Sequence, residues 1–121
     1  MAVLIKIPTY TDSRGKLTVV EKLLPFKIKR VYYIYDVINS ERGGHRHKKT
    51  IQALICINGS CEVYCYDGYK KNNYLLDSPN KCLMVNPQDY HIMRNFSQDA
   101  ILLVLASEYF EKQDYIDEPY D

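Results

Sequence analysis

Short apolar runs recur along this chain, and turn-forming residues separate them about every ten positions. Runs rich in Val, Ile, Leu and Tyr predict strands at residues 3–7, 17–21, 28–37, 51–57, 61–66, 74–76, 81–85, 91–94 and 100–105. Asn58-Gly59 is a strong hairpin signal between two of these strands, and Asp67-Gly68 is a second. Only residues 108–116 suit a helix, and a short one. This pattern predicts an all-β fold, a β-barrel of jelly-roll type.

Length and composition narrow the possible functions. The chain has 121 residues, so we expect a single domain over residues 1–121. A net charge of +1 gives no reason to expect binding to nucleic acid or to an acidic membrane. No apolar run approaches membrane-spanning length and residues 1–10 do not resemble a signal peptide, so a cytoplasmic protein is expected. The four cysteines form no Cys-x-x-Cys pair, and we expect them to be reduced and mostly buried.

The segment at residues 41–49, Glu-Arg-Gly-Gly-His-Arg-His-Lys-Lys, carries the clearest chemical signal. Side chains alternate along a strand, so His45 and His47 would point to the same side of a sheet. If that side lines a cavity, both imidazoles face one ligand, and a group that titrates near neutral pH suits proton transfer. The alternative is a solvated basic loop in which the histidines have no function.

Two sets of residues resemble the cupin motifs. His45, His47, Gln52 and Gly59 have the spacing of the first motif, and Pro87, His91 and Asn95 resemble the second. More specifically, several blocks resemble the dTDP-4-keto-6-deoxyglucose 3,4-ketoisomerases: Arg30-Val-Tyr-Tyr-Ile, Arg42-Gly-Gly-His-Arg-His-Lys-Lys, Leu54-Ile-Cys-Ile-Asn-Gly-Ser-Cys, Asp77-Ser-Pro and Leu105-Ala-Ser-Glu-Tyr-Phe. The resemblance covers residues 12–115, nearly the whole chain.

This resemblance implies a cupin-type jelly-roll barrel, a double-stranded β-helix, that works without a metal or other cofactor. The substrate would be a dTDP-linked 4-keto-6-deoxyhexose, whose keto group moves from C4 to C3 through an enediol. The product would serve the synthesis of 3-amino-3,6-dideoxyhexoses for bacterial surface glycans. The C-terminus is short for this family, which we expect to affect the end of the domain and not the pocket.

The resemblance also implies a homodimer. Small jelly rolls have exposed edge strands, and an N-terminal strand such as that at residues 3–7 can cap a neighbour's sheet.

Two other functions compete with this one. The dTDP-4-keto-6-deoxyglucose 3,5-epimerases share the Asp-x-Arg-Gly turn at residues 12–15 and an Arg-Gly-x-His strand, but they are longer and lack the second histidine. A non-catalytic small-molecule-binding cupin is the third candidate. Such a module is normally fused to a DNA-binding domain, for which 121 residues leave no room.

The reaction suggests a role for each polar side chain. His45 or His47 is expected to take the C3 proton, while the other imidazole and the Tyr33 hydroxyl donate to the enediolate oxygens. His45, His47 and His91 offer three nitrogens to a metal. Gln52 stands where a metal-binding cupin has Glu, and a neutral amide is the poorer ligand, so metal-free chemistry is expected. His91 itself is interpreted as a structural histidine.

Side chains must bind the diphosphate, because the chain has no glycine-rich phosphate loop. Arg42 is the strongest candidate, since a guanidinium matches phosphate oxygens in pairs. Tyr33 and Tyr35 are expected to donate to the sugar or line the pocket, with core packing as the alternative. Lys48 and Lys49 are expected to be solvated. The candidate substrate-binding residues are Arg42, Arg14, Arg30, Tyr35 and Gln52.

Overall fold

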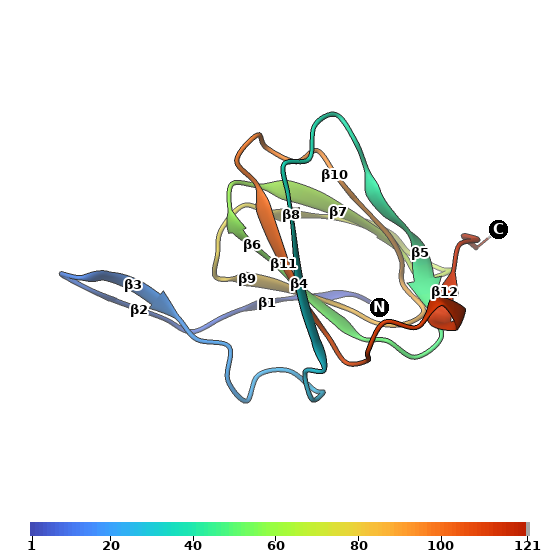
Figure 1. Cartoon of the computed structure of the whole chain (residues 1–121), viewed down its shortest axis with the longest axis horizontal. Helices are drawn as coiled ribbons and strands as arrows, with labels where there is room; N and C mark the ends of the chain where they lie inside the picture. The colour runs from blue at the N-terminus through green and yellow to red at the C-terminus, as the bar shows by residue number, and fades with distance from the viewer. Residues whose placement is uncertain (121) are drawn as a thin grey trace.

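The computed structural model describes residues 1–120 and consists almost entirely of strands (Figure 1). In chain order these are β1 (Val3–Lys6), β2 (Thr9–Asp12), β3 (Gly15–Thr18), β4 (Arg30–Tyr35), β5 (Arg42–His47), β6 (Gln52–Asn58), β7 (Cys61–Tyr66), β8 (Lys71–Leu76), β9 (Lys81–Val85), β10 (Tyr90–Arg94), β11 (Ile101–Ala106) and β12 (Tyr115–Ile116). A 3₁₀ turn, η1 (Lys112–Asp114), precedes β12. Within the described residues, this turn takes the place of the short helix expected at residues 108–116.

Two five-stranded sheets form the body of the protein. Their strand orders are β1-β9-β6-β11-β4 and β12-β5-β10-β7-β8, and each pairing is antiparallel. Except for the consecutive pair β7 and β8, neighbours in each sheet are far apart in the chain, as is typical of a jelly roll. The expectation of an all-β, cupin-type jelly roll is confirmed.

The core lies between the two sheets, and strand alternation explains its composition. In β7 the odd-numbered residues Cys61, Val63 and Cys65 are buried, while the even-numbered ones are partly exposed. Side chains from both sheets meet there; they include Leu54, Leu102 and Val104 of the first sheet and Val63 and Met93 of the second. All four cysteines are buried, as expected, and none is paired in the structure; their reduced state stays a prediction.

The chain passes from one sheet to the other at Gly59, where the sequence predicts a hairpin. β6 pairs with β9 and β11, whereas β7 pairs with β8 and β10, so β6 and β7 do not pair with each other. The Ser60 amide donates to Ser97 Oγ at 2.9 Å, and the Ser97 amide donates to the Ser60 carbonyl at 2.8 Å. A Cβ on Gly59 would lie 2.9 Å from the Cα of Ala100, so close packing at positive φ explains this glycine. The hairpin prediction at Asn58-Gly59 is therefore wrong.

The second predicted hairpin is confirmed, because β7 and β8 pair across the loop that contains Asp67 and Gly68. The Asp67 carboxylate accepts hydrogen bonds from the amides of Tyr69 and Lys70, which explains why Asp suits this turn.

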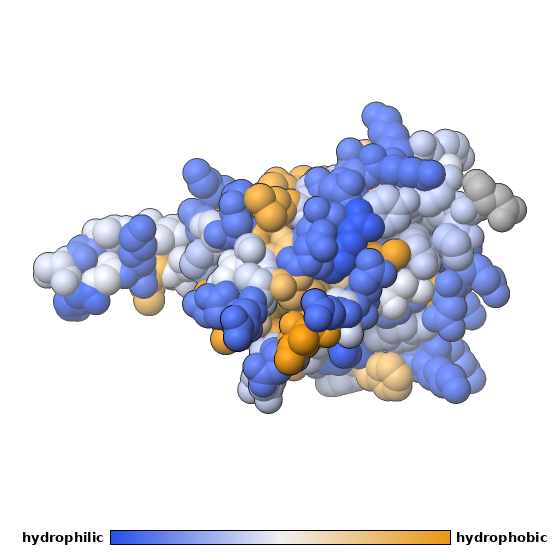
Figure 2. Space-filling model, turned by 90° about the horizontal axis from the view of Figure 1, so that it is seen from above, coloured by the Kyte–Doolittle hydropathy of each residue, from blue (hydrophilic) through white to orange (hydrophobic). Residues whose placement is uncertain are grey.

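Strands β2 and β3 form an arm that projects from the body (Figures 1 and 2). They pair only with each other in a two-stranded sheet, and Tyr10 and Leu17 on them are exposed. β1, which precedes the arm, pairs with β9 of the same chain. Among residues 1–120, the structure contains no helix with the length and apolar character needed to cross a membrane.

Candidate active site

A β-bulge at Gly43 and Gly44 sets the direction of the side chains on β5. His45 is paired with His91 of β10 and Arg42 with Met93, so β5 has one residue more than β10 between these two pairs. Strict alternation would put Arg42 and His45 on opposite faces, since they are three residues apart. The extra residue returns Arg42 to the inner face, where it lines the same cavity as His45.

Both glycines are needed for this bulge. Gly43 has φ of 89° and Gly44 has φ of 78°, a conformation that costs other residues strain. A Cβ on Gly43 would also lie 2.9 Å from the backbone oxygen of His91, whereas a Cβ on Gly44 would meet only the Tyr90 hydroxyl at 3.6 Å.

Three imidazoles cluster where β5 and β10 meet, and of these His45 lines the cavity. The ring centroid of His45 lies 5.2 Å from that of His47 and 5.1 Å from that of His91, both edge to face, and His47 and His91 stack at 6.0 Å. His47 and His91 are buried, while the half-buried His45 lines a cavity of about 370 Å³. His45 and His47 thus lie on one face, as alternation predicts. Their catalytic roles stay a prediction.

Burial favours the neutral form of all three imidazoles. Burial and the neighbouring His47 lower the pKa of His45 to about 4, and burial lowers the pKa of His91 to about 3. The pKa of His47 is lowered as well, mainly by burial, although a hydrogen bond to Asp114 opposes the shift. At neutral pH the rings can therefore accept a proton.

Asp114 lies directly behind His47. Its Oδ2 is 2.8 Å from His47 Nδ1 and also accepts a hydrogen bond from the Thr50 hydroxyl, while its Oδ1 accepts the Lys49 amide at 2.8 Å. Burial raises the pKa of Asp114, but these hydrogen bonds outweigh burial and hold the pKa below its ordinary value. The Nε2 of His47 is buried and has no hydrogen-bond partner in the described residues.

Sequence reasoning missed Asp114, which is 67 residues from His47. Nothing in the local pattern marks this aspartate, because only the fold of the C-terminal segment brings it to the histidine.

On β4, Tyr32 faces the cavity, and Tyr33 and Tyr35 do not. The Tyr32 hydroxyl accepts a hydrogen bond from Gln52 Nε2 at 3.0 Å, and burial raises the pKa of Tyr32 to about 12. Tyr33 and Tyr35 are 61% and 58% exposed, with their rings stacked 5.9 Å apart on the outer face. The expected placement of these two tyrosines is corrected, because the buried Ile34 turns the even-numbered residues of β4 inward.

Gln52 is buried behind the residues that line the cavity. It is 2% exposed and is not one of the residues that line the cavity. Its amide instead orients the Tyr32 hydroxyl, which keeps its own proton for donation into the cavity.

Arg30 enters the cavity beside Tyr32 and has no ion-pair partner among residues 1–120. Its guanidinium lies over the rings of Tyr32 and Phe110, at 5.2 and 5.7 Å from their centroids. Its Nε and one Nη are buried and lack hydrogen-bond partners in the described part of the chain. Arg42 lines the same cavity and is exposed. Two guanidinium groups line the cavity and no described residue adds a carboxylate to the lining, which favours an anionic ligand.

The C-terminal segment forms one wall of the site. Residue Tyr115 of β12 pairs with His47 of β5, and the Tyr115 ring lies 4.7 Å from His45 and 4.5 Å from His47. Phe110 packs against Tyr115 at 5.5 Å. The C-terminal segment that is present contributes Phe110 and Tyr115 to the lining of the cavity, and the expectation that the short C-terminus leaves the pocket unaffected stays a prediction.

Arg14 is not at this site. It lies on the arm, exposed and ion-paired with Asp12 at 2.7 Å, on the opposite side of the body from β5 (Figure 1). Lys48 and Lys49 are exposed, as expected, and Lys49 pairs with Glu111.

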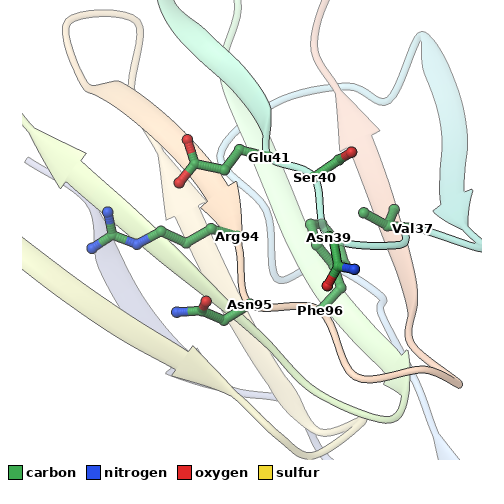
Figure 3. Close-up of a pocket in the computed structure, with 7 residues that line it drawn as sticks. All are labelled: Val37, Asn39, Ser40, Glu41, Arg94, Asn95 and Phe96. Carbon is green, nitrogen blue, oxygen red and sulfur yellow. The ribbon is translucent and has the colours of Figure 1, made fainter.

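A larger hollow, of about 620 Å³, lies where the segment before β5 meets the end of β10 (Figure 3). Its lining residues are Val37, Asn39, Ser40, Glu41, Arg94, Asn95 and Phe96, and none of them is an imidazole. Arg94 donates to Glu62 at 2.7 Å, so its charge is already neutralised. The smaller histidine cavity is the stronger candidate because it combines neutral bases with unpaired cations.

The imidazoles fit a metal only in part. One nitrogen from each of His45, His47 and His91 lies within 4.8 Å of the others, whereas a tetrahedral site needs a spacing of about 3.4 Å between ligand atoms. The fourth position, Gln52, supplies no negative charge, and its amide nitrogen donates to Tyr32. Metal-free chemistry stays a prediction.

Comparison with known proteins gives a consistent result. The family model described as "FdtA: WxcM-like, C-terminal" matches residues 2–121. A TDP-4-oxo-6-deoxy-alpha-D-glucose-3,4-oxoisomerase of Aneurinibacillus thermoaerophilus is 50% identical over 87% of this chain and 78% of its own length.

Solved structures agree. A 3,4-ketoisomerase of Helicobacter canadensis is 40% identical with a TM-score of 0.92, over 97% of this chain and 90% of that one. A histidine-to-asparagine mutant of the Thermoanaerobacterium thermosaccharolyticum 3,4-ketoisomerase, in complex with TDP-4-keto-6-deoxyglucose, is also 40% identical with a TM-score of 0.92, over 97% and 87% of the two chains. With such a match over nearly its whole length, this chain belongs to the FdtA family of cupin-type sugar 3,4-ketoisomerases.

Proposed function

We propose that this protein converts dTDP-4-keto-6-deoxyglucose to a dTDP-3-keto-6-deoxyhexose by moving a proton between C3 and C4 of the sugar. The observation that carries the proposal is the Nε2 of His47, which is buried among neutral imidazoles close to Arg30 and has no hydrogen-bond partner among residues 1–120. Relatives named for this reaction support it.

The proton balance needs no oxidant or reductant. An imidazole takes the C3 proton, and the electron pair of that C–H bond forms the C3–C4 double bond of an enediolate while the C4 oxygen gains charge. Protonation at C4 and loss of the proton from the C3 hydroxyl then leave the ketone at C3. A base with a neutral resting state at pH 7 suits the first step, and hydrogen-bond donors suit the charged oxygens.

Tyr32 and Arg30 can donate hydrogen bonds into the cavity. Tyr32 thus takes the role that was expected of Tyr33. The Tyr32 hydroxyl is oriented by Gln52, and two guanidinium nitrogens of Arg30 lack protein partners within the described residues. Arg42 is exposed at the cavity, which suits binding of the diphosphate outside the reacting sugar.

Incubation with dTDP-4-keto-6-deoxyglucose in D₂O, followed by NMR of the product, tests this function. We expect a product with its ketone at C3 and any incorporated deuterium at C4, because a ketone carbon carries no hydrogen, and no deuterium at C5. Deuterium at C5 would indicate the 3,5-epimerase instead. Tight binding of dTDP without any turnover would indicate a non-catalytic cupin.

We also propose a homodimer and a biosynthetic role. The projecting β2–β3 arm and the exposed aromatic residues Tyr33 and Tyr35 on the outer face of β4 favour contact with a second copy. A monomer mass in solution scattering at micromolar concentration would contradict this. The product ketone would be aminated at C3 to a 3-amino-3,6-dideoxyhexose for surface glycans, in keeping with the family.

A further inference from the structure

We propose that Asp114 is a positioning residue that fixes His47 as the tautomer with its proton on Nδ1, so that the Nε2 lone pair serves as the base for C3. This inference rests on the proposed function and goes beyond it, because it selects His47 over His45. Asp114 itself does not touch the substrate.

The hydrogen bonds around the carboxylate determine the tautomer. Asp114 Oδ1 accepts the Lys49 amide, and Oδ2 accepts the Thr50 hydroxyl and lies 2.8 Å from His47 Nδ1. These donors keep the carboxyl group ionised, and an ionised carboxylate can only accept. Nδ1 of His47 must therefore carry the proton, which leaves Nε2 unprotonated and without a protein partner in the described chain.

The other two imidazoles have no such support. Nδ1 of His91 is 3.0 Å from the backbone oxygen of Asp89, and His45 is hydrogen-bonded to the backbone of Gly43. Among the residues that the structure describes, only His47 of the three forms an ion pair with a carboxylate. A carboxylate stabilises the imidazolium that forms when the ring takes a proton, so the base is expected where the carboxylate is.

The backbone already holds this segment in place without the carboxylate. The Lys48 amide donates to the Asp114 carbonyl at 2.9 Å, the Asp114 amide donates to the Glu111 carbonyl at 3.0 Å, and Tyr115 pairs with His47. A substitution that keeps the size of the Asp114 side chain should therefore leave the wall of the site intact.

The decisive variant is Asp114→Asn. The Lys49 amide can only donate, so the oxygen of the new amide must stay at the Oδ1 position and its NH₂ must face His47 and Thr50. Nδ1 then has to accept, and the ring proton moves to Nε2. In serine proteases the same change lowers kcat by about 10⁴, and we expect a loss of at least about 10² here, with dTDP affinity unchanged.

¹⁵N NMR of the histidine rings reads the tautomer directly. In the parent at pH 7 we expect protonated Nδ1 and unprotonated Nε2 on His47, and the reverse in Asp114→Asn. The parent spectrum alone overturns the proposal if it shows the proton on Nε2, whether or not the variant folds. The proposal also fails if Asp114→Asn keeps the parent tautomer and the parent kcat.

Asp89→Asn is the matched control. Its carboxylate is also buried, and its Oδ2 accepts the Asn86 amide, but the side chain has no hydrogen bond to an imidazole in the described residues. We expect it to lower stability and to leave the His47 tautomer unchanged; a swapped tautomer there would contradict the assignment to Asp114. If the parent does not isomerise the sugar, the proposed function fails, while the NMR result still tests the positioning role.

Discussion

Replacing either glycine of the β5 bulge with alanine tests whether the bulge sets the positions of the catalytic side chains. Gly43→Ala and Gly44→Ala add the same methyl group one residue apart, at φ of 89° and 78°. They differ in what the methyl group meets. At Gly43 it lies 2.9 Å from the backbone oxygen of His91 and 3.2 Å from Met93 Cε, and at Gly44 it lies 3.6 Å from the Tyr90 hydroxyl.

The two costs follow from these contacts. Positive φ costs an L-residue about 1–2 kcal/mol, which is all that we expect for Gly44→Ala. Gly43→Ala adds steric overlap with a strand backbone, worth about 1–3 kcal/mol more, for a total of about 2–5 kcal/mol. Relief of that overlap must move His91 or its partner His45, whose rings are 5.1 Å apart.

Urea unfolding and steady-state kinetics measure both effects. We expect Gly43→Ala to unfold at clearly lower urea than Gly44→Ala and to lose about 10²-fold in kcat/KM, because misplacement by 1 Å has that order of cost. Equal stability of the two variants would refute the packing argument. If the Gly43→Ala enzyme kept the parent kcat/KM, the claim that the bulge positions the catalytic side chains would be refuted.

Four further predictions concern the imidazoles and their neighbours. His45→Asn and His47→Asn should each lower kcat by about 10²–10⁴ in steady-state assays, with little change in the Kd for dTDP measured by calorimetry. Tyr32→Phe should lower kcat, whereas Tyr33→Phe should not, and equal effects would contradict the inward placement of Tyr32. Turnover should survive exhaustive chelation, and loss restored by one divalent ion would overturn the metal-free account. Acid should destabilise the fold, because the pKa of His91 is about 3 in the folded state and about 6.5 in the unfolded state. The free energy of unfolding that this histidine contributes is complete above pH 6.5. It falls by about 1.4 kcal/mol for each pH unit below that. Urea unfolding at pH 7, 6 and 5 measures that slope, which His91→Gln should reduce.

Alternation along the strands predicted much of this fold and half of the site. It placed most strands of the two sheets and put His45 and His47 on one face, but it did not predict β12, which lies where a short helix was expected. It put Tyr32 and Tyr33 on opposite faces of β4. It could not determine which of the two faces inward, because both faces of β4 carry tyrosines. That choice depends on Ile34, whose burial is decided by the opposite sheet.

Other features depend on contacts that local patterns do not encode. The face of Arg42 follows from a bulge whose register is set by β10. The turn at Gly59 has the sequence of a hairpin, yet its partner is the loop that follows β10. Asp114 reaches His47 only through the fold of the last strand.

Phe110 and Tyr115 line the pocket and Asp114 contacts His47, so the site is complete only after this segment has folded onto the barrel. A nascent chain that has released residues 1–109 from the ribosome already contains the imidazoles, Arg30 and Arg42, and both sheets except for β12. It lacks the carboxylate that holds His47 and the ring that covers both His45 and His47. Catalytic competence is therefore expected only once this short segment has docked against β5, because before docking His47 has no carboxylate partner and neither His45 nor His47 is covered by the Tyr115 ring.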